Sequence, residues 1–438
     1  MSATALETDL YQITMMAGYV ARGLPAAVGT FELFARHLPP HRNFLVAAGL
    51  GPFLDYLEGL RFSDEEVSWL ERTAALSRVD RDFFRYLRHF TFTGDVWAMP
   101  EGTAVFGNEP LIRVTAPLPE AQLVETAALA FVNFQTSIAS KAARIVAAAE
   151  GRPVMEFGAR RAHGLGAALY AARAAFLAGC SGTSFVEAGR RFGIPLSGTM
   201  AHSWVLSADD EMTAFREYSE LFGAHSVLLL DTYDTEASAR TLVERGLRPA
   251  AVRIDSGDIV ALSKRVRSIL DAGGLRDTRI LASGDLDEYS IHDLLAARAP
   301  VDAFGVGTSL VTSLDAPALG GVYKLVEVVE NGRIRQVWKT SPGKETWPGR
   351  KQVWRVMDGT ALRDVVTFED EPPPRSAVAL LRPVMKAGRR IAPDPSLEEV
   401  RQWCRARLRE LPAALHDIRQ PATYQVAASE ALQSTRAG

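Results

Sequence analysis

The sequence predicts an α/β fold, with a (β/α) barrel-like domain at residues 151–312 and a discontinuous α+β domain built from the N- and C-terminal segments. Between residues 151 and 312, seven short apolar or β-branched runs occur, and most are followed by an amphipathic helical pattern. Strands that alternate with helices predict a parallel sheet with right-handed crossovers. Seven such units in succession favour a closed barrel over an open doubly wound sheet, although the pattern alone does not settle closure.

The polar residues of this region follow the apolar runs. The expected strands cover residues 153–157, 180–184, 195–199, 226–230, 250–254, 278–282 and 302–304. In barrels, the loops at the carboxyl ends of the strands carry the active site. Ordinary loop residues would not be placed so regularly, so we expect the active site at this end of the barrel.

The flanks, residues 1–150 and 313–438, combine helical and strand patterns and form the expected discontinuous domain. Helices are expected at residues 65–70, 120–149 and 397–410, and strands at residues 30–34, 322–329, 333–339 and 351–357. The tail after about Gln420 is polar and rich in alanine, and we expect it to be loose.

Composition limits the possible partners and compartments. The formal net charge of −3 over 438 residues provides no general electrostatic case for nucleic acid or an anionic membrane. Cys180 and Cys404 are far apart, which argues against a disulfide framework and fits a reducing compartment. The N-terminus does not resemble a signal peptide, and no apolar run approaches the length of a membrane span. We therefore expect a cytoplasmic protein.

His202 is the sharpest candidate for chemistry. It follows the run 195–199, among small residues that leave room for a ligand. Neutral imidazole is a good nucleophile near pH 7, so this histidine could attack phosphate. A hydrogen-bonded loop histidine explains this segment equally well.

Five aspartates form an acidic set at three strand ends: Asp231, Asp234, Asp255, Asp258 and Asp285. Such carboxylates suit a hydrated Mg²⁺ that is bound together with substrate phosphates, and they could also orient a histidine. The alternative is that some are solvated loop residues or helix N-caps, Asp258 in particular.

Two glycine-bearing turns follow the last two expected strands: Ser283-Gly284-Asp285 and Gly305-Val306-Gly307-Thr308-Ser309. Backbone N–H groups in such turns form a phosphate cradle, and the position matches the common phosphate site of barrels. One such turn alone is more often a plain tight turn. Two at consecutive strand ends favour phosphate.

Arg160, Arg161 and His163 follow Phe157 at the end of the first expected strand. Arginine supplies a rigid fork for carboxylate or phosphate, and an aromatic ring supplies a stacking face for a planar ligand. Surface arginines at a helix start are the alternative.

A separate basic group lies in a loop rich in glycine and proline and consists of Lys339, Lys344, Arg350 and Lys351. It could close over a polyphosphate, or it could simply be a solvated loop.

Read together, these segments resemble the nicotinate phosphoribosyltransferase family, in order from about residue 8 to residue 356. The matching stretches are Thr8-Asp9-Leu10-Tyr11-Gln12, Phe31-Glu32-Leu33-Phe34, Glu156-Phe157-Gly158-Ala159-Arg160-Arg161-Ala162-His163-Gly164, Ser197-Gly198-Thr199-Met200-Ala201-His202-Ser203-Trp204, Asp231-Thr232-Tyr233-Asp234-Thr235, Arg253-Ile254-Asp255-Ser256-Gly257-Asp258, Asp302-Ala303-Phe304-Gly305-Val306-Gly307-Thr308 and Pro348-Gly349-Arg350-Lys351-Gln352-Val353. The resemblance implies an ATP-coupled enzyme of the ligase class. It would form nicotinate mononucleotide and pyrophosphate from nicotinate and 5-phosphoribosyl 1-pyrophosphate, in the salvage (Preiss–Handler) route of NAD biosynthesis.

The resemblance also implies roles for single residues. His202 matches the autophosphorylated histidine of the family, with Asp231 as its partner. Phe157 and the partner subunit's Tyr11 would sandwich the pyridine ring, which implies a homodimer with shared active sites.

Further roles follow for both substrates. Arg160 and Arg161, with Thr183 and Ser184, would lie near the nicotinate carboxylate and the ribose phosphate. Groups expected to hold the phosphoribosyl substrate are Arg253, Asp255, Ser283, Gly284, Gly305, Gly307 and Thr308. Mg²⁺ would be held mainly by substrate phosphates, with Asp255 and Asp285. Lys339, Lys344 and Lys351 would form the polyphosphate loop.

The sequence disfavours three competing functions. The related nicotinamide phosphoribosyltransferase has an aspartate where this chain has Ser184, so Ser184 favours the acid. A barrel isomerase or aldolase requires a lysine or glutamate base at a strand end, and none is as well placed as His202. A ligand-binding relative without catalysis would have no need of the combination of His202, Asp231 and Asp255.

Overall fold

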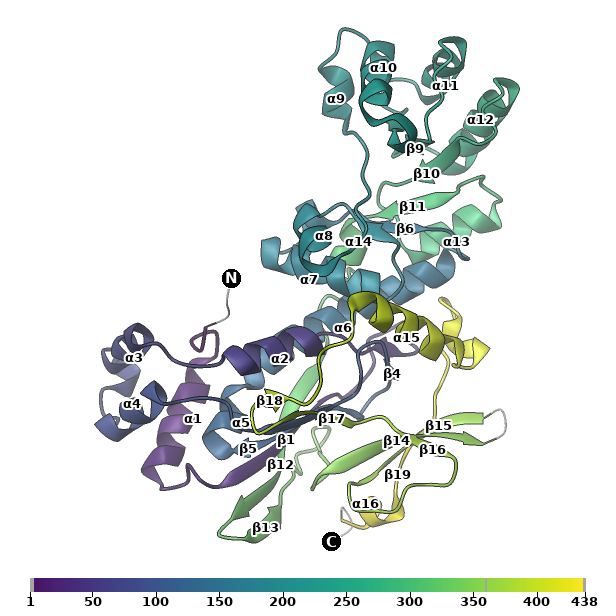
Figure 1. The fold of residues 1–438 in the computed structure, drawn as a ribbon. Helices are drawn as coiled ribbons and strands as arrows, with labels where there is room; N and C mark the ends of the chain where they lie inside the picture. Colours follow the sequence, from purple (N-terminus) through teal and green to yellow (C-terminus); the bar gives the residue numbers. More distant parts are fainter. Residues whose placement is uncertain (1–3, 359–360, 436–438) are drawn as a thin grey trace. The chain divides into compact units, whose positions relative to one another are not determined.

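The computed structural model describes residues 4–358 and 361–435, and the chain divides into two compact units (Figure 1). Unit 1 consists of Met1–Ser137, Ala318–Ser396 and Ala406–Gly438, and unit 2 of Ile138–Pro317 and Leu397–Arg405. Helices α6 (Glu125–Ala148) and α15 (Leu397–Arg409) contribute residues to both units. None of the described helices is long and apolar enough to cross a membrane.

Unit 2 contains a parallel sheet of six strands in the order β7-β6-β11-β10-β9-β8, drawn in teal to green in Figure 1. Its strands are β6 (Val154–Glu156), β7 (Gly182–Thr183), β8 (Val227–Leu229), β9 (Ala251–Ile254), β10 (Arg279–Ala282) and β11 (Ala303–Val306). Every neighbouring pair is parallel, which confirms the predicted parallel sheet. The apolar side chains of the central strands, such as Val252, Ile280 and Phe304, are fully buried.

The expectation of a closed barrel was wrong. The third of the seven expected strands, residues 195–199, forms one isolated parallel bridge instead, between Thr183 and Leu196. On the side of β8, its contact is a side-chain hydrogen bond, in which Thr199 Oγ1 donates to the Val227 carbonyl at 2.7 Å. Pro195 lacks an N–H and Gly198 weakens a strand, so this run does not sustain a ladder. The described strands therefore form a curled half-barrel.

Helices connect the strands of unit 2: α7 (Leu165–Leu177), α8 (Val186–Phe192), α9 (His202–Leu206), α10 (Glu211–Phe222), α11 (Thr235–Glu244), α12 (Ile259–Ala272), α13 (Glu288–Ala296) and α14 (Thr308–Val311). Two members of the acidic set begin helices. Asp234 accepts from Ala237 N at 2.8 Å, and Asp258 accepts from Ala261 N at 3.0 Å. These two aspartates are N-caps, so the structural alternative is the right one for both.

Unit 1 is built on a seven-stranded antiparallel sheet in the order β13-β12-β1-β5-β3-β17-β18. The strands are β1 (Val28–Ala35), β3 (Asp95–Ala98), β5 (Pro110–Pro117), β12 (Gly321–Glu330), β13 (Arg333–Gln336), β17 (Arg382–Lys386) and β18 (Arg389–Arg390). A two-stranded sheet, β2 (Leu45–Val46) and β4 (Ala104–Val105), lies outside it. The helices are α1 (Leu10–Ala21), α2 (Leu50–Gly59), α3 (Asp64–Glu71), α4 (Arg81–Arg88) and α5 (Leu118–Leu123).

The expected flanking elements occur, with two changes. The long helical pattern at residues 120–149 is divided into α5 and α6, and the second expected C-terminal strand stops at Gln336. The remaining strands of unit 1 form a four-stranded sheet, β16-β14-β15-β19. They are β14 (Lys351–Asp358), β15 (Ala361–Phe368), β16 (Ala377–Ala379) and β19 (Val426–Ala428).

The prediction of a loose tail after Gln420 was also wrong. Strand β19 pairs in parallel with β15, and helix α16 (Glu430–Ser434) follows, with Leu432 fully buried. Ser429 caps this helix by accepting from Leu432 N at 3.2 Å. The polar, alanine-rich composition concealed a short strand whose partner is distant in sequence.

A buried polar cluster secures this tail. Arg355 on β14 donates from Nε and Nη2 to Asp364 on β15, at 2.9 and 2.7 Å. The Tyr424 hydroxyl donates to the same carboxylate at 2.9 Å, and its ring stacks on Phe106 at 3.7 Å between centroids. The carboxyl group of Glu109 faces Asp364. Burial, followed by the negative charge of Asp364, raises the pKa of Glu109 well above its ordinary value, although Arg355 opposes this.

We expect Glu109→Gln to stabilise the protein increasingly as pH rises. An acid whose pKa is raised by folding adds most to the free energy of unfolding below its unfolded pKa. That stabilisation is lost as the pH rises through its folded pKa. Glutamine mimics the protonated acid and cannot ionise. The Tm of the variant should therefore match wild type near pH 5 and exceed it near pH 8.5. Glu65→Gln, at an exposed position of α3, is the control, and parallel Tm curves for Glu109→Gln and wild type would contradict the prediction.

Candidate active site

Three side chains meet at the carboxyl ends of β9 and β10 in unit 2. Arg253 Nε donates to Ser283 Oγ at 2.7 Å, and Arg253 Nη2 donates to Asp255 Oδ1 at 2.5 Å. Ser283 Oγ donates to the same Asp255 oxygen, also at 2.5 Å. The two strands are adjacent and parallel, with Ile254 in register with Ala282, so residues that follow them lie side by side. We call these three residues the strand-end cluster.

Asp255 is a stable anion in this cluster. Burial raises its pKa, but the hydrogen bond from Ser283 and the positive charge of Arg253 outweigh burial, and the net pKa lies below the ordinary value. The charge of His202 lowers it further, so the histidine is within electrostatic reach. Arg253 is thereby held by a carboxylate that remains ionised at neutral pH.

The turn after β10 has no room for a side chain at Gly284. Its φ is +88°, and a Cβ there would lie 1.9 Å from the Asp255 carbonyl oxygen. The next residue, Asp285, is exposed and also has a positive φ of 44°. The turn thus brings its main chain against the β9 turn, as a backbone anion cradle requires.

The second glycine turn leaves space for the ring of Phe157. A Cβ at Gly305 would lie 2.5 Å from Phe157 Cδ2, and Phe157 N donates to the Val306 carbonyl at 2.8 Å. Gly307 immediately precedes α14, whose first residue is Thr308. The ring therefore rests on the end of β11 because position 305 has no side chain.

His202 is the first residue of α9, and its Nδ1 lies 3.1 Å from Thr232 Oγ1. The resemblance implied Asp231 as its partner, but the structure gives Asp231 other donors. Asp231 Oδ2 accepts from Asp255 N at 3.2 Å and from Ser256 Oγ at 2.5 Å. Asp231 Oδ1 is buried without a hydrogen bond among the described residues. The β9 turn therefore occupies one oxygen of this carboxylate.

The residues expected around the acceptor differ in exposure. Arg160 and Arg161 lie in a 3₁₀ turn (Ala159–Arg161), and both are exposed, as is Ser184. Thr183 is fully buried, and its hydroxyl is already used, because it donates to Glu156 and accepts from Phe185 N. The Thr183 hydroxyl is therefore committed to the protein itself, and the expected place of Thr183 near the substrates stays a prediction.

The basic loop of unit 1 is only partly available. Lys339 and Lys344 are exposed, whereas Lys351 is buried. Lys351 Nζ donates to the carbonyls of Trp347, Pro348 and Gly349 and pairs with Glu32 Oε2 at 2.9 Å. Burial lowers the pKa of Lys351, and Glu32 counteracts this. Lys351 thus supports the loop from within, and its expected polyphosphate contact was wrong.

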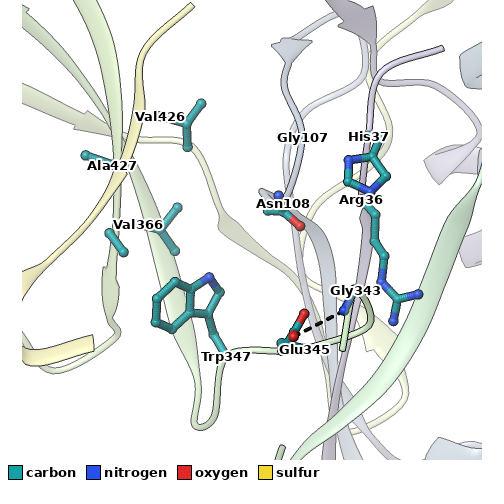
Figure 2. A pocket seen from close by; sticks show the side chains of 11 residues that line it. Arg36, His37, Gly107, Asn108, Gly343, Glu345, Trp347, Val366, Val426 and Ala427 are labelled. Atoms are coloured by element: carbon teal, nitrogen blue, oxygen red, sulfur yellow. Dashed lines mark hydrogen bonds between the residues drawn. The ribbon is translucent and has the colours of Figure 1, made fainter. Parts of the chain in front are cut away.

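A cavity of about 330 Å³ adjoins this loop within unit 1 (Figure 2). Arg36 and His37, which directly follow β1, line it together with Trp347 and Glu345. Arg36 Nη2 donates to the Lys344 carbonyl at 3.3 Å, so this arginine touches the loop. The contact of Arg36 with this loop could not be predicted from the sequence, because Arg36 lies over 300 residues before Lys344.

The carboxylates do not form a protein-only metal site. Among the described residues, no group of three or more His, Cys, Asp or Glu side chains could hold a metal ion. Asp255 Oδ1 already accepts from Arg253 and Ser283. Mg²⁺ is commonly bound by one or two carboxylates together with substrate phosphates, so a Mg²⁺ ion at these strand ends would need phosphate oxygens as further ligands.

Taken together, fold and site define an α/β protein whose charged cluster lies at the carboxyl ends of a curled parallel sheet. The model of the nicotinate phosphoribosyltransferase (NAPRTase) family matches residues 153–365. Its N-terminal and C-terminal domain models match residues 6–133 and 373–436. The chain belongs to the nicotinate phosphoribosyltransferase family.

Individual relatives agree. The chain is 46% identical over 435 residues to nicotinate phosphoribosyltransferase pncB2 of Mycobacterium tuberculosis, covering 97% of this chain and 92% of that protein. It is 45% identical over 363 residues to the nicotinate phosphoribosyltransferase of Bacillus subtilis, covering 81% and 73%. The crystal structure of human nicotinic acid phosphoribosyltransferase superposes with a TM-score of 0.85 at 29% identity, covering 98% of this chain and 99% of that chain.

We expect Gly284→Ala to destabilise the protein. The left-handed conformation and the contact with the Asp255 carbonyl should together cost about 2 kcal/mol or more. That corresponds to a fall in Tm of roughly 4–8 °C for a unit of this size. Gly198→Ala is the matched control, because a Cβ there meets nothing within 4 Å. Equal Tm values for the two variants would show that the turn is not as tight as described.

Proposed function

We propose that the chain forms nicotinate mononucleotide and pyrophosphate from nicotinate and 5-phosphoribosyl 1-pyrophosphate, coupled to ATP hydrolysis through a phosphohistidine at His202. The product would enter NAD biosynthesis by the salvage route. The strand-end cluster carries this proposal. In a chain of this family, an arginine–carboxylate pair lies at the carboxyl end of the sheet, within electrostatic reach of His202.

The acceptor would stack on Phe157, with its carboxylate toward Arg160 and Arg161. Both arginines are exposed and can move to a ligand, and a guanidinium fork matches a carboxylate. Ser184 is exposed beside them and has no charge to repel an acid, which favours nicotinate over its amide.

The phosphoribosyl substrate would lie across the ends of β9, β10 and β11. Backbone N–H groups of Gly284, Gly307 and Thr308 would receive its 5′-phosphate, and Arg253 would face the pyrophosphate. Breaking the bond between ribose C1 and pyrophosphate leaves positive charge on the sugar and further negative charge on the leaving group. Mg²⁺, when bound, would neutralise part of that negative charge. The pyridine nitrogen of nicotinate then bonds to C1, and pyrophosphate departs.

His202 would accept the γ-phosphoryl group of ATP and later lose it to water, which releases phosphate. Its Nδ1 faces the Thr232 hydroxyl, which leaves Nε2 as the nucleophilic atom. Asp255 is ionised nearby and would stabilise the positive imidazole ring.

We further propose a homodimer in which Tyr11 of one subunit covers the nicotinate site of its partner. Helix α1 supports this proposal, because Leu10 and Tyr11 are 53% and 47% exposed, and Met15 is exposed on the same helix. Large apolar side chains gathered on one exposed helix mark an interaction surface.

The first test is mononucleotide formation from nicotinate or nicotinamide, with and without ATP, in wild type and His202→Ala. We expect wild type to use nicotinate and to be stimulated by ATP. His202→Ala should lose the stimulation, because it has no phosphoryl acceptor. Acid-labile ³²P label from [γ-³²P]ATP should appear on wild type only.

Product from nicotinamide alone would overturn the proposed acceptor. ATP stimulation that persists in His202→Ala would overturn the phosphohistidine.

A second test separates the lysines of the basic loop. Lys344→Ala should raise the KM for ATP or 5-phosphoribosyl 1-pyrophosphate severalfold with little change in Tm, because its side chain is exposed. Lys351→Met should lower Tm strongly, because it leaves buried Glu32 without its ion-pair partner, a loss of about 3–5 kcal/mol. An unchanged Tm in Lys351→Met would contradict the structural role of this lysine.

A further inference from the structure

We infer that Glu156 is a positioning residue that joins the two strand-end loops expected to bind the acceptor ring. This inference rests on the proposed function. Glu156 ends β6 and is almost completely buried, so its carboxylate cannot itself contact a substrate. Its influence must pass through the groups that it binds.

Each carboxylate oxygen of Glu156 accepts from a different loop. Oε1 accepts from Gly158 N at 2.5 Å, which curls the chain directly after Phe157. Oε2 accepts from Thr183 Oγ1 at 2.6 Å, at the end of the neighbouring strand β7. One side chain thus bridges the loop that carries Phe157, Arg160 and Arg161 and the loop that carries Ser184.

The bridge extends further along the second loop. Thr183 Oγ1 accepts from Phe185 N at 3.0 Å, and Ser184 N donates to the Glu156 main-chain carbonyl at 3.0 Å. The main chain on both sides of Ser184 is therefore held by Glu156, directly or through one hydroxyl. Loss of the carboxylate would remove a side-chain hydrogen bond from both loops at once.

The chemistry requires an ionised acid. Both groups that face the carboxylate are donors, because the Thr183 oxygen is already an acceptor for Phe185 N. Glutamine has the same shape, but its NH₂ group would face a donor and leave one bond unmade. Burial raises the pKa of Glu156, and the two hydrogen bonds oppose this shift. Burial, followed by the negative charge of Glu156, raises the pKa of the Cys180 thiol.

The test compares Glu156→Gln and Thr183→Val with wild type. For each variant we expect the KM for nicotinate to rise by about tenfold, the effect of one strong hydrogen bond, with kcat and the KM for 5-phosphoribosyl 1-pyrophosphate within about twofold. The conservative variant Thr183→Ser keeps the hydroxyl and should restore the nicotinate KM.

Glu120→Gln is a matched control. Glu120 of unit 1 is also buried and accepts from the main-chain N and the hydroxyl of one threonine, Thr93, at 2.6 and 3.0 Å. The Glu120→Gln variant should have a lower Tm and an unchanged nicotinate KM. This result would separate a general loss of stability from a loss of positioning.

The outcomes are distinct. A wild-type enzyme that does not use nicotinate would overturn the proposed function itself. An active wild type with an unchanged nicotinate KM in Thr183→Val would overturn the role of Glu156, as would equal increases in both KM values. Thr183→Val removes a single hydroxyl, so it tests the bridge even if Glu156→Gln does not fold.

Discussion

The candidate site depends on the ion pair between Arg253 and Asp255 at the end of β9. Arg253 is buried, and an unpaired guanidinium there would be costly. Asp255 supplies the charge, Ser283 fixes both partners, and the Asp255 carbonyl requires glycine at position 284. Through Ser283, this pair links the ends of the neighbouring strands β9 and β10. Any substrate that replaces Asp255 as the partner of Arg253 must carry comparable negative charge, which agrees with a pyrophosphate.

The proposed acceptor site is built in a similar way, with buried groups that hold exposed ones. The ring of Phe157 occupies the space that a side chain at position 305 would fill, and Glu156 accepts a hydrogen bond from Gly158 N in the same loop. Exposed arginines stand on this rigid base. A ring fixed in place beside exposed arginines suits the proposed flat, acidic acceptor, because the stacking plane is set before the ligand binds.

The fold of unit 2 could be predicted from sequence because its signals are local. Alternating strands and helices, glycine turns and N-cap aspartates such as Asp258 each depend on neighbouring residues. The misses depend on distant partners. The burial of Lys351 depends on Glu32, over 300 residues earlier, and the order of the tail depends on Asp364 and Tyr424. The prediction of a closed barrel failed because the run 195–199, which contains Pro195 and Gly198, does not pair as a strand.

Two buried acids, Glu109 and Glu156, have structural roles that the sequence pattern did not predict. Glu109 and Glu156 read as ordinary polar residues, but each lies inside the protein with a raised pKa. Their contacts differ in kind. Glu109 faces another carboxylate and needs a proton, whereas Glu156 faces only donors and needs its charge. The type of neighbour, and not burial alone, therefore decides which form of the acid the fold requires. This difference makes glutamine a faithful substitute at position 109 and a damaging one at position 156.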